Sequence, residues 1–145
     1  MERQYQILIV DDDDDILSSY QDYFTKQGFI VKVAHNGIEG LEKLREIDFD
    51  VALVDINMPN MNGLEMIKQA NKENIDTDMV ILSGEGEGDR NDAIAAINIG
   101  VSAWFEKSRG VMSDLLNKIK ELSGFISLNE IERLLSALHQ PDGYR

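Results

Sequence analysis

Two short apolar runs, each ending in aspartate, constrain the fold of this chain more than any other feature. Residues 7–10 (ILIV) run into Asp11 and Asp12, and residues 51–54 (VALV) run into Asp55. Apolar runs of this length bounded by turn residues are typical of buried strands in a parallel sheet. In an open parallel sheet, the residues just past the carboxyl ends of the strands line the ligand crevice. The two runs therefore predict that the three aspartates lie side by side at one mouth of the sheet.

Clustered carboxylates repel one another and are costly to keep ionised without a cation. A hard divalent ion that prefers oxygen ligands, Mg²⁺ above all, relieves that repulsion. The sequence therefore predicts a Mg²⁺ pocket with an aspartate as its reactive group. The next three acids, Asp13, Asp14 and Asp15, are interpreted as solvated residues of the loop and first helical turn, where negative charge suits the helix dipole.

The acidic balance of the chain excludes several classes of partner. With 145 residues and a net charge of −13, we expect one domain that avoids nucleic acid and anionic membranes. No apolar stretch approaches the roughly 20 residues of a membrane span, and residues 1–6 lead into a strand without a signal-peptide pattern. Cysteine is absent, which excludes disulfides and fits a cytoplasmic location. His35 and His139 match no metal-ligand spacing.

Strand-like and helix-like patterns alternate five times along the chain, which predicts βαβ units around a parallel sheet, the α/β class. Strands are expected at 7–10, 29–34, 51–55, 79–83 and 101–106. Helices are expected to follow them at about 16–27, 36–44, 64–70, 93–99 and 111–122. In the second helix, Ile38, Leu41 and Leu44 are expected on the apolar face. The fifth strand is the least apolar, which favours a place at the edge of the sheet.

The tail departs from this rhythm and suggests a division into residues 1–124 and an extension, residues 125–145. Residues 127–130 (SLNE) resemble a capping box, so an extra C-terminal helix is expected. Its apolar stripe comprises Ile131, Leu134, Leu135 and Leu138. Three roles stay open for this helix: packing on the body, pairing in a homodimer, or beginning a linker.

Five landmarks, in this order along the chain, resemble the receiver domain of two-component response regulators from about residue 6 to residue 124. They are the pair Asp11-Asp12, Asp55 with its Met58-Pro59…Gly63 turn, Ser83, Trp104 and Lys107. The resemblance implies a doubly wound, flavodoxin-like sheet of five strands in the order 2-1-3-4-5. It also implies that Asp55 is the phosphoacceptor, with Mg²⁺ held by Asp12, Asp55 and the backbone carbonyl of Asn57, and by Asp11 through a water.

The remaining landmarks fit the chemistry of phosphoryl transfer, which needs positioning and charge neutralisation. Lys107 would place a compact positive charge against a phosphoryl oxygen, and Ser83 would donate its hydroxyl to another. Asn57 and Glu85 would flank the attacking water and tune the lifetime of the phosphorylated form. The resemblance makes Trp104 a switch residue that turns inward after phosphorylation, and it makes the fourth helix, fifth strand and fifth helix the face that changes.

Two departures from the family pattern affect these expectations. Lys107 is followed by Ser108, where the family commonly has a cis-linked proline, so either a strained cis bond or a different loop path is expected. Residues 84–89 (GEGEGD) make a connection about two residues longer than usual. This loop is either a mobile switch or a flexible, solvated insertion.

The leading hypothesis is a phosphorylation-controlled signalling switch that catalyses only its own phosphorylation and dephosphorylation. Its expected partners are a sensor histidine kinase or histidine phosphotransfer domain and an unknown downstream effector. One alternative is a phosphohydrolase with an aspartate nucleophile, although Asn57 would be a poor general acid. Another is an interaction module that kept the fold without phosphorylation.

Overall fold

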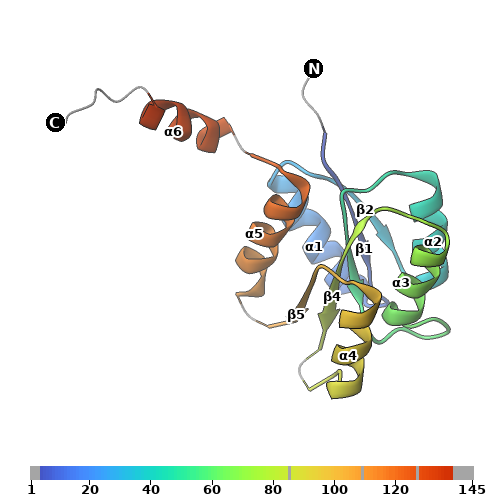
Figure 1. Cartoon of the computed structure of the whole chain (residues 1–145). Helices are drawn as coiled ribbons and strands as arrows, with labels where there is room; N and C mark the ends of the chain where they lie inside the picture. Colours follow the sequence, from blue (N-terminus) through green and yellow to red (C-terminus); the bar gives the residue numbers. More distant parts are fainter. Residues whose placement is uncertain (1–3, 85, 109, 127, 139–145) are drawn as a thin grey trace.

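Five parallel strands form one sheet in the order β2-β1-β3-β4-β5 in the computed structural model, which describes residues 4–84, 86–108, 110–126 and 128–138 (Figure 1). The strands are β1 (Gln6–Val10), β2 (Ile30–Ala34), β3 (Val51–Asp55), β4 (Asp78–Ser83) and β5 (Ala103–Glu106). This is the doubly wound, flavodoxin-like order that the sequence predicts. The expected edge position of β5 is also confirmed, and none of its four residues is fully buried.

Each strand is followed by a helix, and a sixth helix ends the described chain. The helices are α1 (Asp14–Lys26), α2 (Gly37–Glu46), α3 (Gly63–Lys72), α4 (Arg90–Ile99), α5 (Val111–Ser123) and α6 (Leu128–Leu138). Local sequence sets several ends: Asn36 caps α2 through a hydrogen bond from the Glu39 N–H, and Gly124 ends α5 in the left-handed conformation.

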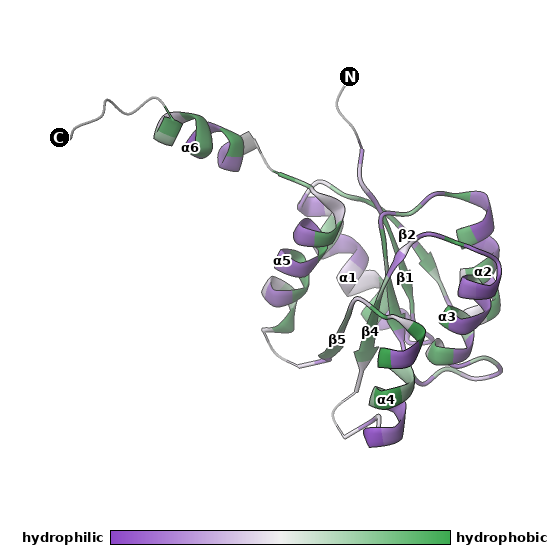
Figure 2. Ribbon diagram, viewed as in Figure 1, coloured by the Kyte–Doolittle hydropathy of each residue, from purple (hydrophilic) through white to green (hydrophobic). Residues whose placement is uncertain are grey.

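The sheet separates two hydrophobic clusters, because successive residues of a strand point to opposite faces. On one face, Leu8, Val10 and Val54 pack under α2, α3 and α4. On the other, Ile7 and Ile9 pack under α1 and α5. Apolar residues fill the strands through the middle of the molecule, while the helices are polar on their outer sides (Figure 2). Burial on both faces explains why the strand sequences read as continuous apolar runs.

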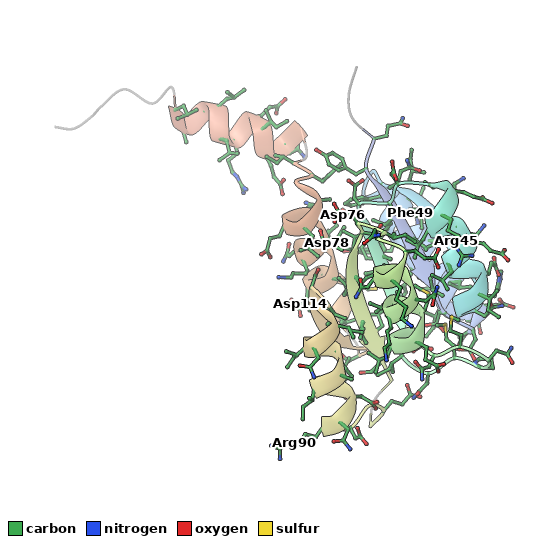
Figure 3. All side chains as sticks on the ribbon, turned by 45° about the vertical axis from the view of Figure 1, so that its right-hand side comes forward. Arg45, Phe49, Asp76, Asp78, Arg90 and Asp114 are labelled. Atoms are coloured by element: carbon green, nitrogen blue, oxygen red, sulfur yellow. The ribbon has the colours of Figure 1, made fainter. Side chains whose placement is uncertain are left out.

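The predicted C-terminal helix is present and extends away from the body, with its side chains clear of the sheet (Figures 1 and 3). An ion pair of 3.0 Å joins Lys120 of α5 to Glu130 of α6. Ile131, Leu134 and Leu138 are exposed. Ser127, the expected capping residue, lies outside the described residues, and so does His139.

On the predicted apolar face of α2, Leu41 and Leu44 are buried as expected, but the prediction for Ile38 is wrong. Ile38 is 51% exposed, and the buried positions of α2 include Gly37, Gly40, Leu41 and Leu44. A β-carbon on Gly40 would lie 2.9 Å from Met66 Sδ and 3.1 Å from Val10 Cγ2. Gly40 therefore lets the helix approach the sheet closely, and Ile38 lies on the exposed side.

Candidate functional site

The carboxyl ends of β1 and β3 bring three aspartates together. Asp11, Asp12 and Asp55 each offer a carboxylate oxygen within 4.8 Å of the others. Asp11 and Asp55 are buried, with 1% and 3% of their surface exposed, whereas Asp12 faces the solvent. The site is therefore a small acidic pocket with two carboxylates on its floor and one at its rim.

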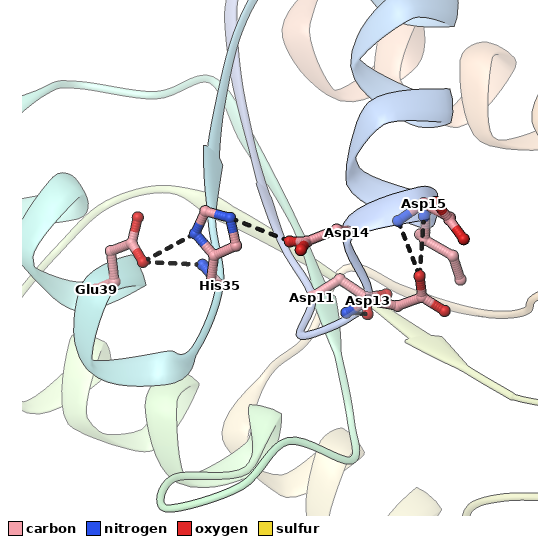
Figure 4. Close-up of polar contacts among 7 residues, drawn as sticks. Asp11, Asp13, Asp14, Asp15, His35 and Glu39 are labelled. Atoms are coloured by element: carbon pink, nitrogen blue, oxygen red, sulfur yellow. Dashed lines mark hydrogen bonds and ion pairs between the residues drawn. The ribbon is translucent and has the colours of Figure 1, made fainter.

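The loop after β1 is held by the acids that follow the apolar run (Figure 4). Asp11 Oδ1 accepts a hydrogen bond of 2.9 Å from the Asp13 N–H. Asp13 is exposed, as expected, and it is also the N-cap of α1, where its side chain accepts hydrogen bonds from the N–H groups of Asp15 and Ile16. Because the cap fixes where α1 begins, it also fixes the direction in which Asp11 and Asp12 leave the strand.

Lys107, which follows β5, enters this pocket. Its Nζ lies 2.7 Å from Asp11 Oδ2 and 3.1 Å from Asp55 Oδ1, and its side chain is 16% exposed. Its backbone N–H donates to the Ser83 carbonyl at 2.7 Å. The described chain contains no cis peptide bond, so the bond between Lys107 and Ser108 is trans and the loop follows a different path from a cis-linked one. The lysine side chain nevertheless reaches the aspartates.

The electrostatics of the pocket disfavour two ionised carboxylates without a cation. Burial, followed by the charge of Asp11, raises the pKa of Asp55 to about 6 from 3.8, although Lys107 acts in the opposite direction. Burial alone would lower the pKa of Lys107, but its contacts with Asp11 and Asp55 outweigh burial and raise it. One lysine therefore neutralises only part of the charge that three aspartates bring.

The two buried carboxylates share a single positive partner. Asp11 Oδ2 and Asp55 Oδ1 lie 2.7 and 3.1 Å from Lys107 Nζ, and among the described residues these two oxygens have no further hydrogen-bond partner. An all-oxygen set of carboxylates is the donor set that Mg²⁺ prefers. The residues present thus fit a hard divalent cation.

Ser83 and Trp104 lie together on the neighbouring strands β4 and β5. Ser83 is buried, and its Oγ accepts a hydrogen bond of 3.0 Å from the Trp104 indole N–H. Asn57 lies in the loop after β3 with an exposed side chain, and Glu85 lies outside the described residues.

Gly63 supports the site in a way that its sequence position alone did not reveal. A β-carbon at this position would collide with the backbone carbonyl of Asp55. The Gly63 N–H also donates to the Ile56 carbonyl at 3.0 Å, which closes the turn after β3. The signal in the sequence was the glycine at the end of the Met58-Pro59 turn, where a close backbone approach requires the absence of a side chain.

The class of this protein is defined by a doubly wound parallel sheet with three clustered aspartates and a partly buried lysine at its carboxyl edge. The model of the response regulator receiver domain family matches residues 7–134, and the chain therefore belongs to that family, whose members are signalling domains. The matched region continues into α6.

Relatives and solved structures agree with this assignment. The response regulator SaeR of Staphylococcus aureus (strain USA300) is 31% identical over 101 residues, which are 70% of this chain and 43% of SaeR. A CheY-like receiver domain protein from Methanospirillum hungatei JF-1 is 33% identical, with a TM-score of 0.78 over 84% of this chain and 95% of that one. TrrA from Thermotoga maritima, solved in complex with Mg²⁺ and BeF, is 27% identical, with a TM-score of 0.73 over 82% of this chain and 99% of that one.

The chain spans less than half of the length of SaeR. Within the described part of the chain, every helix is too short or too polar to cross a bilayer.

Proposed function

We propose that this chain is a phosphorylation-controlled switch in which Asp55 accepts a phosphoryl group from a phosphohistidine donor. The observation that carries the proposal is the pairing of Lys107 Nζ with two buried carboxylates, 2.7 Å from Asp11 and 3.1 Å from Asp55. A lysine held over a buried nucleophile and beside a cation pocket supplies the charge neutralisation that phosphoryl transfer needs.

In the proposed reaction, an Asp55 carboxylate oxygen attacks the phosphorus of the donor. A P–O bond forms, the P–N bond to the donor imidazole breaks, and the electron pair leaves with the imidazole nitrogen. The nucleophile must be ionised, which the neighbouring Lys107 favours. Mg²⁺, bound by Asp12, Asp55 and the Asn57 carbonyl, with Asp11 acting through water, would neutralise charge on the transferred oxygens.

The other site residues act on the phosphoryl group once it is in place. Lys107 would turn from the Asp55 carboxylate, which loses its charge in the acyl phosphate, to a phosphoryl oxygen. Ser83 would donate its hydroxyl to a second oxygen. Asn57, in the loop after β3, and Glu85 would tune the rate at which water removes the group.

The proposed output face comprises α4, β5 and α5. On α4, Ile94 and Ile97 are 46% and 75% exposed, which leaves apolar surface for a partner beside Trp104. A sensor histidine kinase or a histidine phosphotransfer domain would be the donor, and a downstream effector would read this face in the cytoplasm. Residues 1–124 would form the switch, while the extension 125–145 would link it to another domain or pair with a second copy.

Intact-mass spectrometry after incubation with acetyl phosphate tests the proposal. The chain should gain one phosphoryl group with Mg²⁺ present and almost none in EDTA. Asp55→Asn should gain none under either condition. If the folded wild-type chain gains no phosphoryl group when Mg²⁺ is present, the switch is refuted, and an interaction module of the same fold becomes the better explanation.

A further inference from the structure

The Trp104 indole makes a polar contact that a phenylalanine or tyrosine ring could not make in the same way. Its N–H donates to Ser83 Oγ at 3.0 Å. An indole N–H is only a donor, and a serine hydroxyl has one proton and two acceptor lone pairs. The indole therefore fills an acceptor site on Ser83 and leaves the hydroxyl proton to be donated in another direction.

The backbone of Ser83 is held independently. Its carbonyl accepts the Lys107 N–H at 2.7 Å, and the preceding residue, Leu82, pairs with Asp55 in the sheet. Ser83 is therefore fixed between the nucleophile strand and the lysine. The remaining freedom is rotation of its side chain and hydroxyl, and the indole restricts that freedom.

The loop after β4 is shaped to admit the ring. A β-carbon on Gly88 would lie 2.7 Å from Trp104 Cζ2, whereas a β-carbon on Gly86 would meet nothing within 4 Å. Both glycines have positive φ, +80° and +77°. Beyond the ring, residues 86–90 and α4 border an open groove that Trp104 also lines. Because this side is open, packing alone does not fix the ring, and the hydrogen bond to Ser83 sets its position.

We propose that Trp104 is a positioning residue for phosphoryl transfer: its indole N–H orients the Ser83 hydroxyl so that the hydroxyl proton is available to a phosphoryl oxygen on Asp55, in space that Gly88 provides. This inference rests on the proposed function. It adds that the indole is in place before phosphorylation, so orienting Ser83 requires no inward rotation of the ring.

The hydrogen bond can be tested without any phosphorylation, because Trp104 is the single tryptophan of the chain. The protein therefore has one indole N–H signal in a ¹⁵N correlation spectrum. Ser83→Ala should accelerate solvent exchange of this N–H roughly two- to tenfold, the factor that corresponds to one hydrogen bond. Gly88→Ala should also accelerate this exchange, because the new β-carbon would displace the ring. Gly86→Ala introduces a similar backbone strain without a clash against the ring, so it should leave the exchange rate unchanged. Equal exchange in the wild type and in Ser83→Ala would overturn the proposal.

The role of Trp104 in phosphoryl transfer can be tested by a double-mutant cycle. The measured quantity is the rate at which acetyl phosphate phosphorylates Asp55 in the presence of Mg²⁺. Trp104→Phe should slow the reaction roughly two- to tenfold in the wild-type background and should have no further effect in Ser83→Ala. If Trp104→Phe slows both backgrounds by the same factor, the indole does not act through Ser83 and the proposal fails. A wild-type chain that accepts no phosphoryl group would refute the proposed function and this role with it, whereas the exchange measurements would still report on the hydrogen bond.

Discussion

Replacing Asp55 with asparagine should stabilise the protein when Mg²⁺ is removed, because the buried carboxylate is charged at neutral pH and insufficiently compensated. Its pKa is raised from 3.8 to about 6. Because its side chain is only 4% exposed, water screens the charge of the carboxylate only weakly. Each pKa unit corresponds to about 1.4 kcal/mol. At pH 7.5 the ionised form therefore costs up to about 3 kcal/mol relative to a neutral side chain.

The pH dependence of this difference has a definite sign. Below pH 3.8 the carboxyl is protonated in both the folded and the unfolded chain, and ionisation has no effect on stability. Between pH 3.8 and about 6 the folded chain keeps a proton that the unfolded chain loses, so the wild type loses stability as the pH rises. The difference in the free energy of unfolding between Asp55→Asn and the wild type should thus grow from pH 4 to above pH 6 and then remain constant.

Urea denaturation in EDTA at pH 4, 5, 6 and 7.5 would measure the effect. The control is Asp76→Asn, which removes the same charge from an exposed aspartate before the amino end of β4, far from the site (Figure 3). With saturating Mg²⁺, the wild type should instead be more stable than Asp55→Asn, because a ligand that binds the folded wild type stabilises it. If Asp55→Asn has the same stability as the wild type, or less, in EDTA at pH 7.5, the reasoning about this pocket is wrong.

Three other changes have expected results. Lys107→Met should lower the free energy of unfolding by roughly 3–5 kcal/mol in EDTA at pH 7.5, because it leaves two buried carboxylates unpaired; an unchanged urea midpoint would contradict this. Glu73 pairs with Arg45 at 2.6 and 2.7 Å, and this contact, followed by that of Gln69, lowers the pKa of Glu73 to about 2. The stability difference between wild type and Glu73→Gln should therefore be constant above pH 4.5 and shrink as the pH falls toward 2, and a difference that grows in acid would refute the pairing. Asp13→Ala should cost about 1 kcal/mol by removing the cap of α1, whereas Asp13→Ser should cost less because serine can also cap; equal losses in thermal unfolding would argue against capping.

The order of the elements could be predicted because it depends on local patterns. A run such as VALV followed by aspartate identifies a buried strand and its carboxyl end, and the fold then places those ends together. The positions of Asp11, Asp12 and Asp55 follow from this topology alone. Lys107 reaches the same mouth because β5 is parallel to its neighbours, even though the loop after it lacks the proline that is usual in the family.

The features that could not be predicted depend on how elements approach one another. Ile38 has the right spacing for a buried face, but the glycine at position 40 carries no apolar signal and yet lies on the side of α2 that meets the sheet. The contact between Trp104 and Ser83 similarly depends on the distance between two side chains from different strands. The role of Gly88 depends on the position of that ring, so the glycine-rich loop could be interpreted from the sequence only as flexible.

The division of the hydrophobic core by the sheet has a consequence for how a signal could travel. Neighbouring residues of β5 belong to different compartments: Trp104 packs with the cluster under α2, α3 and α4, and Phe105 packs with the cluster under α1 and α5. A displacement of the indole would therefore act first on the packing beneath α4 and would reach α5 through the next residue of the same strand. In such a sheet, the edge strand is the wall that the two compartments share, so one strand can pass a change from one side to the other.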